Sequence, residues 1–88
     1  MRKTPKPIER VDLPVICQEF AKGIEKSGFY VDFYRFGIIR YVQVKLYPNE
    51  YPIAEGYYGR SWVDAVRMCS AEFELYRMGD EVFRECQK

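Results

Sequence analysis

Histidine is missing from the chain, and other residues that carry catalytic or metal chemistry are sparse. The 88 residues include no His, one Trp and three Cys. Without His, the usual general base near neutral pH and the commonest metal ligand are both missing. The glycines do not form a phosphate-binding loop, and no Cys-x-x-Cys pair occurs. The sequence therefore predicts that the protein is not an enzyme and binds no metal and no cofactor.

The chain also lacks a marked excess of either charge and any long apolar run. Its 14 Lys and Arg nearly balance 13 Asp and Glu, giving a net charge of +1. The sequence pI of about 7.6 is well below the basicity typical of a nucleic-acid-binding module. No segment has the length of a membrane span, and the N-terminus has no signal-peptide pattern. We expect a cytoplasmic protein that does not associate with membranes.

The number and spacing of the cysteines indicate free thiols. Three cysteines cannot close a disulfide framework, and Cys17, Cys69 and Cys86 lie far apart in the sequence. Cys17 and Cys69 fall on apolar helical faces, where a free Cys behaves as a small core residue. We expect both to be buried thiols.

A helix is predicted after a basic N-terminal arm. Residues 1–11 contain Pro5 and Pro7, which favour extended backbone, and residues 12–88 are expected to form a single domain. Asp12 has the character of an N-cap, and Gly28 of a helix stop. Apolar residues between them recur at helical spacing: Leu13, Ile16, Cys17, Phe20, Ala21 and Ile24.

The middle of the chain has the two-residue alternation of strands. Residues 29–35 and 38–47 are rich in β-branched and aromatic residues, with Gly37 between them. They predict two strands, or one long bent strand, because Gly37 is the only residue there suited to a positive φ. A turn at 48–50 leads to a third strand at about 53–58, in which Gly56 indicates a bulge or a close backbone approach.

A second helix is predicted from Ser61 to Gly79. Ser61 has the character of an N-cap, and Asp80 could cap a last short helix. The order α-β-β-β-α predicts an α+β fold with a three-stranded antiparallel sheet, both helices on one face and a short C-terminal helix. We expect one core built from these residues: Phe20, Ile24, Val42, Val44, Trp62, Val66, Cys69 and Phe73.

Tyrosine is concentrated in the strands. Seven of the eight tyrosines fall between residues 30 and 58. Alternation places Phe29, Val31, Phe33, Val42, Val44 and Leu46 inward. It leaves the other face of the sheet as a candidate partner-binding surface, formed by Tyr30, Tyr34, Tyr41, Gln43, Lys45 and Tyr47. Tyrosine is amphipathic and enriched at binding surfaces, although it also favours strands in general. The arm adds four cations as a second candidate: Arg2, Lys3, Lys6 and Arg10.

The order of elements resembles the double-stranded-RNA-binding domain over roughly residues 12–78. The resemblance includes Ala54-Glu55-Gly56 in the last strand, followed by a loop and a long helix from Ser61. It implies binding of duplex RNA through the first helix, a loop between strands and lysines at the start of the last helix. That helix here starts Ser61-Trp62-Val63-Asp64, without lysine, so no residue is transferred as a duplex contact.

Three functions remain open on the sequence. The first is a non-catalytic protein-binding module, an accessory or inhibitor protein from a phage or other mobile element, that docks a protein through the tyrosine-rich face or an edge strand. The second is a single-stranded nucleic-acid binder that stacks bases on tyrosines, with Lys45 and the arm on the backbone. The third is a homodimer that uses the same face or edge.

Overall fold

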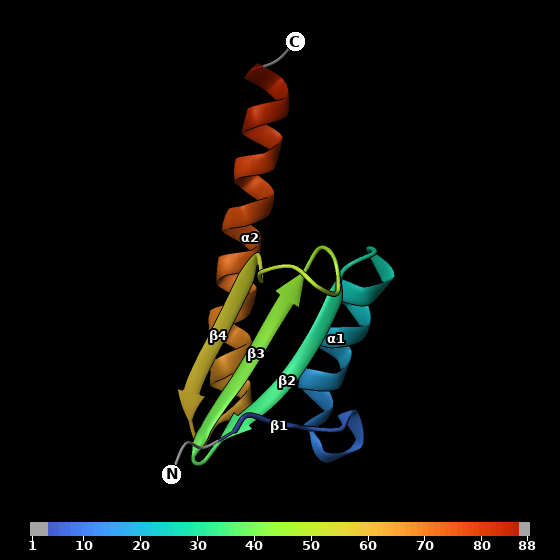
Figure 1. Ribbon diagram of the computed structural model, residues 1–88. Coiled ribbons are helices and arrows are strands. Elements are labelled where there is room, and N and C mark those ends of the chain that lie inside the picture. The colour runs from blue at the N-terminus through green and yellow to red at the C-terminus, as the bar shows by residue number, and fades with distance from the viewer. Residues whose placement is uncertain (1–3, 87–88) are drawn as a thin grey trace.

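The computed structural model describes residues 4–86, and side chains from Thr4 to Asp80. Two helices and four strands account for most of them (Figure 1). In chain order they are β1 (Lys6–Pro7), a 3₁₀ turn (Arg10–Asp12), α1 (Val15–Lys26), β2 (Tyr30–Phe36), β3 (Ile39–Lys45), β4 (Ala54–Gly59) and α2 (Trp62–Cys86).

The sheet is antiparallel with strand order β1-β2-β3-β4. The prediction of three strands is wrong, because the arm supplies a fourth. Lys6 pairs with Arg35 and Pro7 with Tyr34, and the Ile8 N–H donates to the Phe33 carbonyl. Pro7 fits this position because β1 is an edge strand, where a missing N–H is tolerated.

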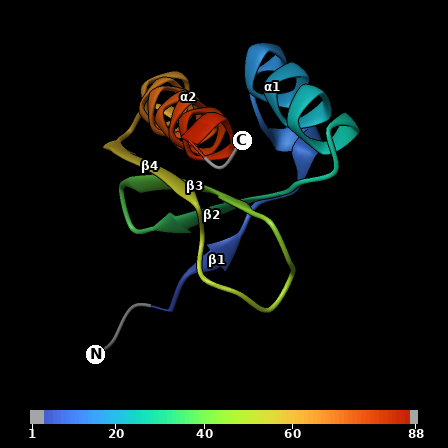
Figure 2. The ribbon, with the colours of Figure 1, turned by 90° about the horizontal axis from the view of Figure 1, so that it is seen from above.

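Both helices lie on one face of the sheet, as the sequence predicts (Figure 2). Five of the eight residues expected in the core belong to one buried apolar cluster, in which Val42, Val44 and Cys69 are completely buried, and Phe20, Ile24 and Trp62 are partly buried and pack against it. Phe73 packs edge-on to Phe29, with ring centroids 5.0 Å apart. Leu46 was expected to face inward but is 36% exposed, because β3 ends one residue before it.

Three local signals act as the sequence indicates. Gly28 follows α1 with a φ of +92°, and its N–H donates to the Glu25 carbonyl. The Ser61 Oγ accepts the Asp64 N–H at 3.2 Å and so caps α2. The two residues between β2 and β3 form a tight hairpin in which Gly37 has a φ of +59°. A type II′ turn needs a positive φ only at its first central position, so a single glycine suffices.

Two predicted helix boundaries are wrong. Asp12 does not cap α1: it belongs to the 3₁₀ turn, and α1 begins after Pro14 with no side-chain cap. Gly79 does not end α2, which runs without a break to Cys86, so there is no separate short C-terminal helix. Glycine ends a helix when it adopts a positive φ, and Gly79 is not among the residues that do.

Gly56 marks a close approach between β4 and α2. The pairing of β3 with β4 is regular from Ile39 to Val44, so β4 contains no bulge. A Cβ on Gly56 would overlap the Ala65 carbonyl oxygen and lie 2.6 Å from the Cys69 nitrogen. The absence of a side chain at this position therefore lets the helix backbone rest directly on the strand.

Candidate binding face of the sheet

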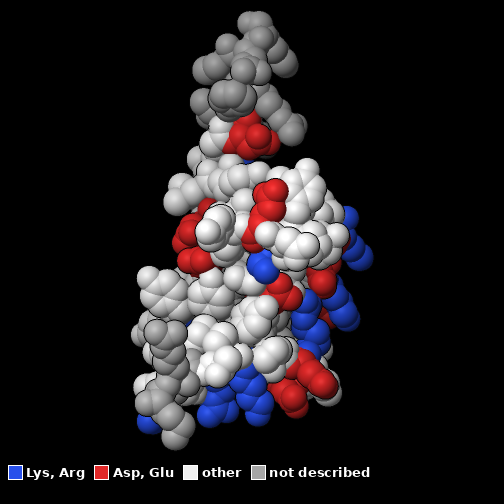
Figure 3. Space-filling view, in the orientation of Figure 1, with Lys and Arg blue, Asp and Glu red and all other residues white. Residues whose placement is uncertain are grey.

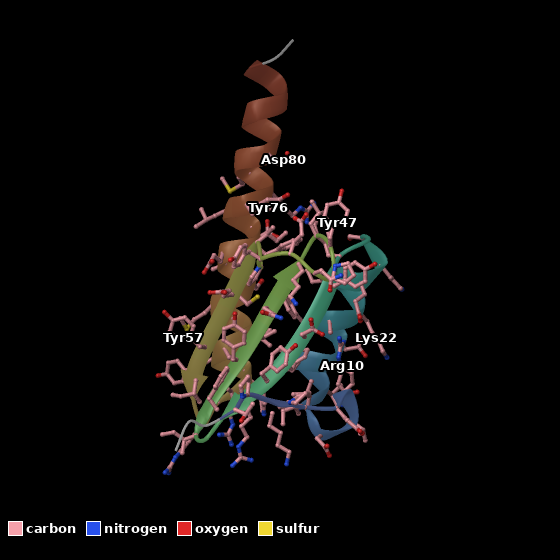
Figure 4. The ribbon with its side chains drawn as sticks, in the orientation of Figure 1. Arg10, Lys22, Tyr47, Tyr57, Tyr76 and Asp80 are labelled. Carbon is pink, nitrogen blue, oxygen red and sulfur yellow. The ribbon has the colours of Figure 1, made fainter. Side chains whose placement is uncertain are left out.

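A row of tyrosines crosses three strands on the outer face of the sheet, the face turned away from both helices. Tyr34 on β2 pairs with Tyr41 on β3, which pairs with Tyr57 on β4. The rings of Tyr34 and Tyr41 have centroids 6.3 Å apart, and Phe36 packs edge-on to Tyr41 at 5.9 Å. Tyr57 is 57% exposed and lies on β4, the strand at the edge of the sheet (Figure 4).

A polar row runs beside the tyrosines and holds Tyr41 in place. The Tyr41 hydroxyl donates to Glu55 Oε1 at 2.7 Å and lies 3.3 Å from Gln43 Oε1. The Gln43 amide nitrogen is 3.5 Å from Asp32 Oδ2, so these contacts link β2, β3 and β4. Burial, followed by the hydrogen bond to Glu55 and its negative charge, raises the pKa of the Tyr41 hydroxyl well above its ordinary value of 10. Tyr41 therefore remains a neutral hydrogen-bond donor across the physiological range.

The six residues predicted for this face differ in how much surface they offer. Tyr30 and Tyr47 are exposed. Tyr30 pairs with Lys45 at the end of the β2–β3 ladder opposite the hairpin, and Tyr47 lies at the same end (Figure 4). Tyr34 and Tyr41 are half-buried. Gln43 was expected to face a partner but is only 8% exposed, because neighbouring side chains cover it and bind its amide.

Lys45 is also engaged within the chain. Its Nζ lies 3.8 Å from Asp32 Oδ2 and donates to the Pro48 carbonyl at 3.3 Å, and only 17% of the side chain is exposed. A lysine held in this way gives the face little free positive charge.

Tyr57 was missing from the predicted set, although it has the most exposed ring in the tyrosine row. A bulge at Gly56, one of the two interpretations that the sequence allows, would turn the residues after it to the other face of the strand. Regular pairing with β3 places Glu55 and Tyr57 on the outer face and Gly56 on the inner face. The signal was the carboxylate of Glu55, which favours the solvent side of a strand.

The predicted basic arm is divided among different roles. Arg10 donates to Glu25 at 3.0 Å and to the Val31 carbonyl at 2.5 Å, and its guanidinium stacks over the Phe33 ring at 5.1 Å. It therefore ties the arm to the domain. Lys6 is exposed in β1. Arg2 and Lys3 lie outside the described residues.

A basic end of the sheet forms around the hairpin, which the sequence did not reveal. Arg35 pairs with Lys6 on one side and with Arg40 on the other. A shallow hollow of about 400 Å³ lies between the arm and the hairpin, lined by Thr4, Lys6, Arg35 and Gly37. Lys and Arg side chains are visible at this end of the molecule in Figure 3. Strand pairing alone brings these cations together, since they come from separate segments.

The two edges of the sheet differ. The β1 edge is two residues long and contains Lys6 and Pro7, features that discourage another strand from pairing. The β4 edge is six residues long and has no proline. The Arg60 N–H donates to the Ile38 carbonyl, so Arg60 directs its backbone groups toward β3. In an antiparallel ladder this direction alternates from one residue to the next. The backbone N–H and C=O groups of Glu55 and Tyr57 therefore point away from β3, toward the open edge. The β4 edge is therefore able to accept a further strand.

The structure also bears on metal binding, disulfide formation and membrane spanning in the part of the chain that it describes. Within it, no three His, Cys, Asp or Glu side chains form a group that could hold a metal ion. Cys17 and Cys69 are buried free thiols, as expected, and burial raises the pKa of both. None of the helices in the described range has the length and apolar character needed to cross a membrane.

Comparison with known proteins gives no relative for this chain. No protein-family model matches it, and neither the curated proteins nor the solved structures include a match.

Proposed function

We propose that the protein is a small non-catalytic binding module that docks a partner protein through its tyrosine face, the row Tyr34, Tyr41 and Tyr57 with the adjoining β4 edge. The observation that carries this proposal is the row itself: three tyrosines in register across three strands, on the side that neither helix covers. Tyrosine combines a large flat contact area with a polar tip, and it is enriched among the residues that dominate binding energy.

The tyrosine face is organised before any partner arrives. Tyr41 is fixed by its hydrogen bond to Glu55 and by ring contacts to Tyr34 and Phe36. Side chains already held in place lose little conformational entropy on binding, which favours affinity. The exposed ring of Tyr57 then offers an anchor beside an edge that can pair with an extended segment of the partner.

Charge favours a protein over a nucleic acid as the partner. A single-stranded nucleic acid on this face needs cations along its backbone. Lys45 is engaged by Asp32 and Pro48, and Arg10 by Glu25 and Val31. The carboxylates of Asp32 and Glu55 lie in the row beside the tyrosines and repel phosphate.

The experiment compares single tyrosine variants in affinity capture from the native host lysate, with quantitative mass spectrometry. Tyr34→Ala and Tyr57→Ala are each expected to weaken capture of the same protein about 10- to 100-fold, as loss of an aromatic anchor does. Tyr51→Ala is the matched control, because Tyr51 is 94% exposed and lies in the loop before β4.

Two results contradict the proposal. One is capture that Tyr34→Ala and Tyr57→Ala leave unchanged. The other is tight binding of a single-stranded oligonucleotide that both variants abolish, since it makes the face a base-stacking platform. A duplex RNA titrated in parallel is expected to bind no more tightly than non-specific contacts allow, with Kd of roughly 10⁻⁴–10⁻⁶ M by analogy with DNA.

A further inference from the structure

The helix α2 is longer than the sheet that it covers, and its second half projects beyond the rest of the molecule (Figure 1). The molecule measures 50 × 30 × 21 Å along its principal axes. Leu75 and Met78, in the second half of α2, are 66% and 58% exposed. A helix surrounded by water normally carries polar side chains, so two large apolar side chains along one side of it indicate a surface that another element covers.

The exposed apolar residues of α2 form a stripe with the spacing of a helix–helix seam. Met68, Ala71, Leu75 and Met78 are exposed, and they follow one another at intervals of three, four and three residues. This is the spacing of apolar positions in helices that pair. The buried residues Cys69 and Phe73 lie on the side of the helix that faces the sheet, so the stripe faces away from it.

A groove that suits such a stripe lies between α1 and the first half of α2. Its volume is about 440 Å³, and Ile16 and Phe20 from α1 and Val63 and Ala71 from α2 are among its lining residues. Ile16 is 61% exposed in this groove. Among the residues whose side chains the structure describes, the charged one that lines it is Arg67, whose side chain is 76% exposed.

We propose that a second copy of this chain covers both features, with the two α2 helices packed antiparallel. The second-half residues of each stripe, Leu75 and Met78, then lie in the groove beside the first half of the other helix. One chain carries both the apolar stripe and the groove that receives it. In a pair of copies each stripe is covered by the other copy's groove, and the assembly closes as a two-fold dimer. This is the mode in which an amphipathic helix lies in an apolar groove.

Charge supports the antiparallel direction. Glu74 borders the stripe, is 62% exposed and lies 3.9 Å from Arg77 of the same helix. Arg67 lies 3.6 Å from Asp64. Both are exposed i,i+3 pairs, which contribute little to stability and leave the groups open to a second partner. In the antiparallel pair the Glu74 of one copy lies near Arg67 in the other copy's groove. A parallel pair instead brings the two Glu74 carboxylates to the same level and leaves both grooves empty.

The dimer leaves the outer face of the sheet free, because the stripe and the groove lie on the helical side. The proposal is therefore independent of the proposed function, and its failure does not affect the tyrosine face. Together they describe a molecule that presents two tyrosine faces, one from each copy.

Analytical ultracentrifugation of the full chain tests the proposal. The wild type is expected to sediment with twice the 10.5 kDa mass of one chain at concentrations above a Kd of about 1 μM. The double variant Leu75→Glu/Met78→Glu and the single variant Ile16→Lys are each expected to be folded monomers, with Kd raised more than about 100-fold. The substituted positions are exposed, so circular dichroism is expected to be unchanged. Tyr51→Glu, a change of charge away from the stripe and the groove, is expected to remain dimeric.

Mixing the two monomeric variants tests the reciprocal arrangement. Leu75→Glu/Met78→Glu keeps an intact groove, and Ile16→Lys keeps an intact stripe, so a 1:1 mixture restores one native contact. The other contact places a lysine near the new carboxylates. Dimers are therefore expected in the mixture and in neither variant alone.

A wild type that is monomeric at the highest concentration overturns the proposal, as does a dimer that survives Leu75→Glu/Met78→Glu. A mixture that stays monomeric overturns the antiparallel arrangement. A dimer that Tyr57→Ala dissociates and the stripe variants do not places the interface at the sheet and also overturns it.

Discussion

Substitution of Gly56 by alanine tests the contact on which the packing of α2 depends. A Cβ at this position would overlap the Ala65 carbonyl oxygen and lie 2.6 Å from the nitrogen and 2.9 Å from the Cβ of Cys69. Two of these three atoms are helix backbone, which cannot rotate away as a flexible side chain would. The strand and the helix must separate instead, and a gap of 0.5–1 Å forfeits about a quarter to a half of the attraction at each contact it opens.

Overpacking of this kind costs about 1–3 kcal/mol, and the backbone neighbours favour the upper end. A domain of 88 residues has a free energy of unfolding of about 4–13 kcal/mol, so a loss of about 3 kcal/mol lowers Tm by roughly 12–24 °C. Urea unfolding measures the loss directly. The fluorescence of Trp62, the single tryptophan, reports it, because its ring packs edge-on to Phe33 at 5.8 Å.

Gly59→Ala is the matched control in the same strand. A Cβ on Gly59 meets nothing within 4 Å, and its φ is not positive. Alanine there is expected to leave the free energy of unfolding unchanged or to raise it by up to about 1 kcal/mol, since it restricts the unfolded chain. If Gly56→Ala and Gly59→Ala are equally stable within about 0.5 kcal/mol, the close contact between β4 and α2 is refuted.

Three further predictions concern the core, the arm and the response to alkali. Phe73→Ala is expected to lower the free energy of unfolding by about 3–5 kcal/mol in urea titration, and a loss below about 1 kcal/mol contradicts its burial. Arg10→Ala is expected to cost about 1–2 kcal/mol by the same measurement. Lys22→Ala, which removes only an exposed ion pair with Glu19, is expected to change stability by less than about 0.5 kcal/mol. Burial, with smaller contributions from two nearby carboxylates, raises the pKa of the Cys69 thiol to about 12. Because the thiol ionises more easily in the unfolded chain, the protein keeps its full stability below pH 9.0, the ordinary pKa, and loses stability as the pH rises from about 9 to 12. Unfolding titrations at pH 7 and pH 10.5 are expected to show a loss of roughly 2 kcal/mol from this group, and Cys69→Ala is expected to show a correspondingly smaller loss; an equal loss in both proteins contradicts it.

The elements whose signals are local were predictable from the sequence. The apolar stripes of both helices, the cap at Ser61 and the stop at Gly28 depend on residues within one or two turns of each other. Alternation placed Val42 and Val44 in the core for the same reason, because a strand has only two faces. The continuous α2 was not predictable from Gly79, since a glycine costs a helix only about 1 kcal/mol and ends it only in a particular conformation.

The sequence by itself thus determined the places of the two long helices and of β2, β3 and β4, which of their faces are apolar, and that tyrosines gather in the sheet. Only the tertiary structure decided which strands and side chains those residues contact. The arm became a strand because the edge of β2 was there to pair with Pro7, and Arg10 became a tie because Glu25 and Val31 lie beside it. Tyr57 joined the tyrosine face, and Gln43 was buried, because register and cross-strand neighbours are set by residues distant in sequence. The residue pattern of a single segment does not indicate such pairings, because the contacts that stabilise them form only when segments distant in sequence pack together.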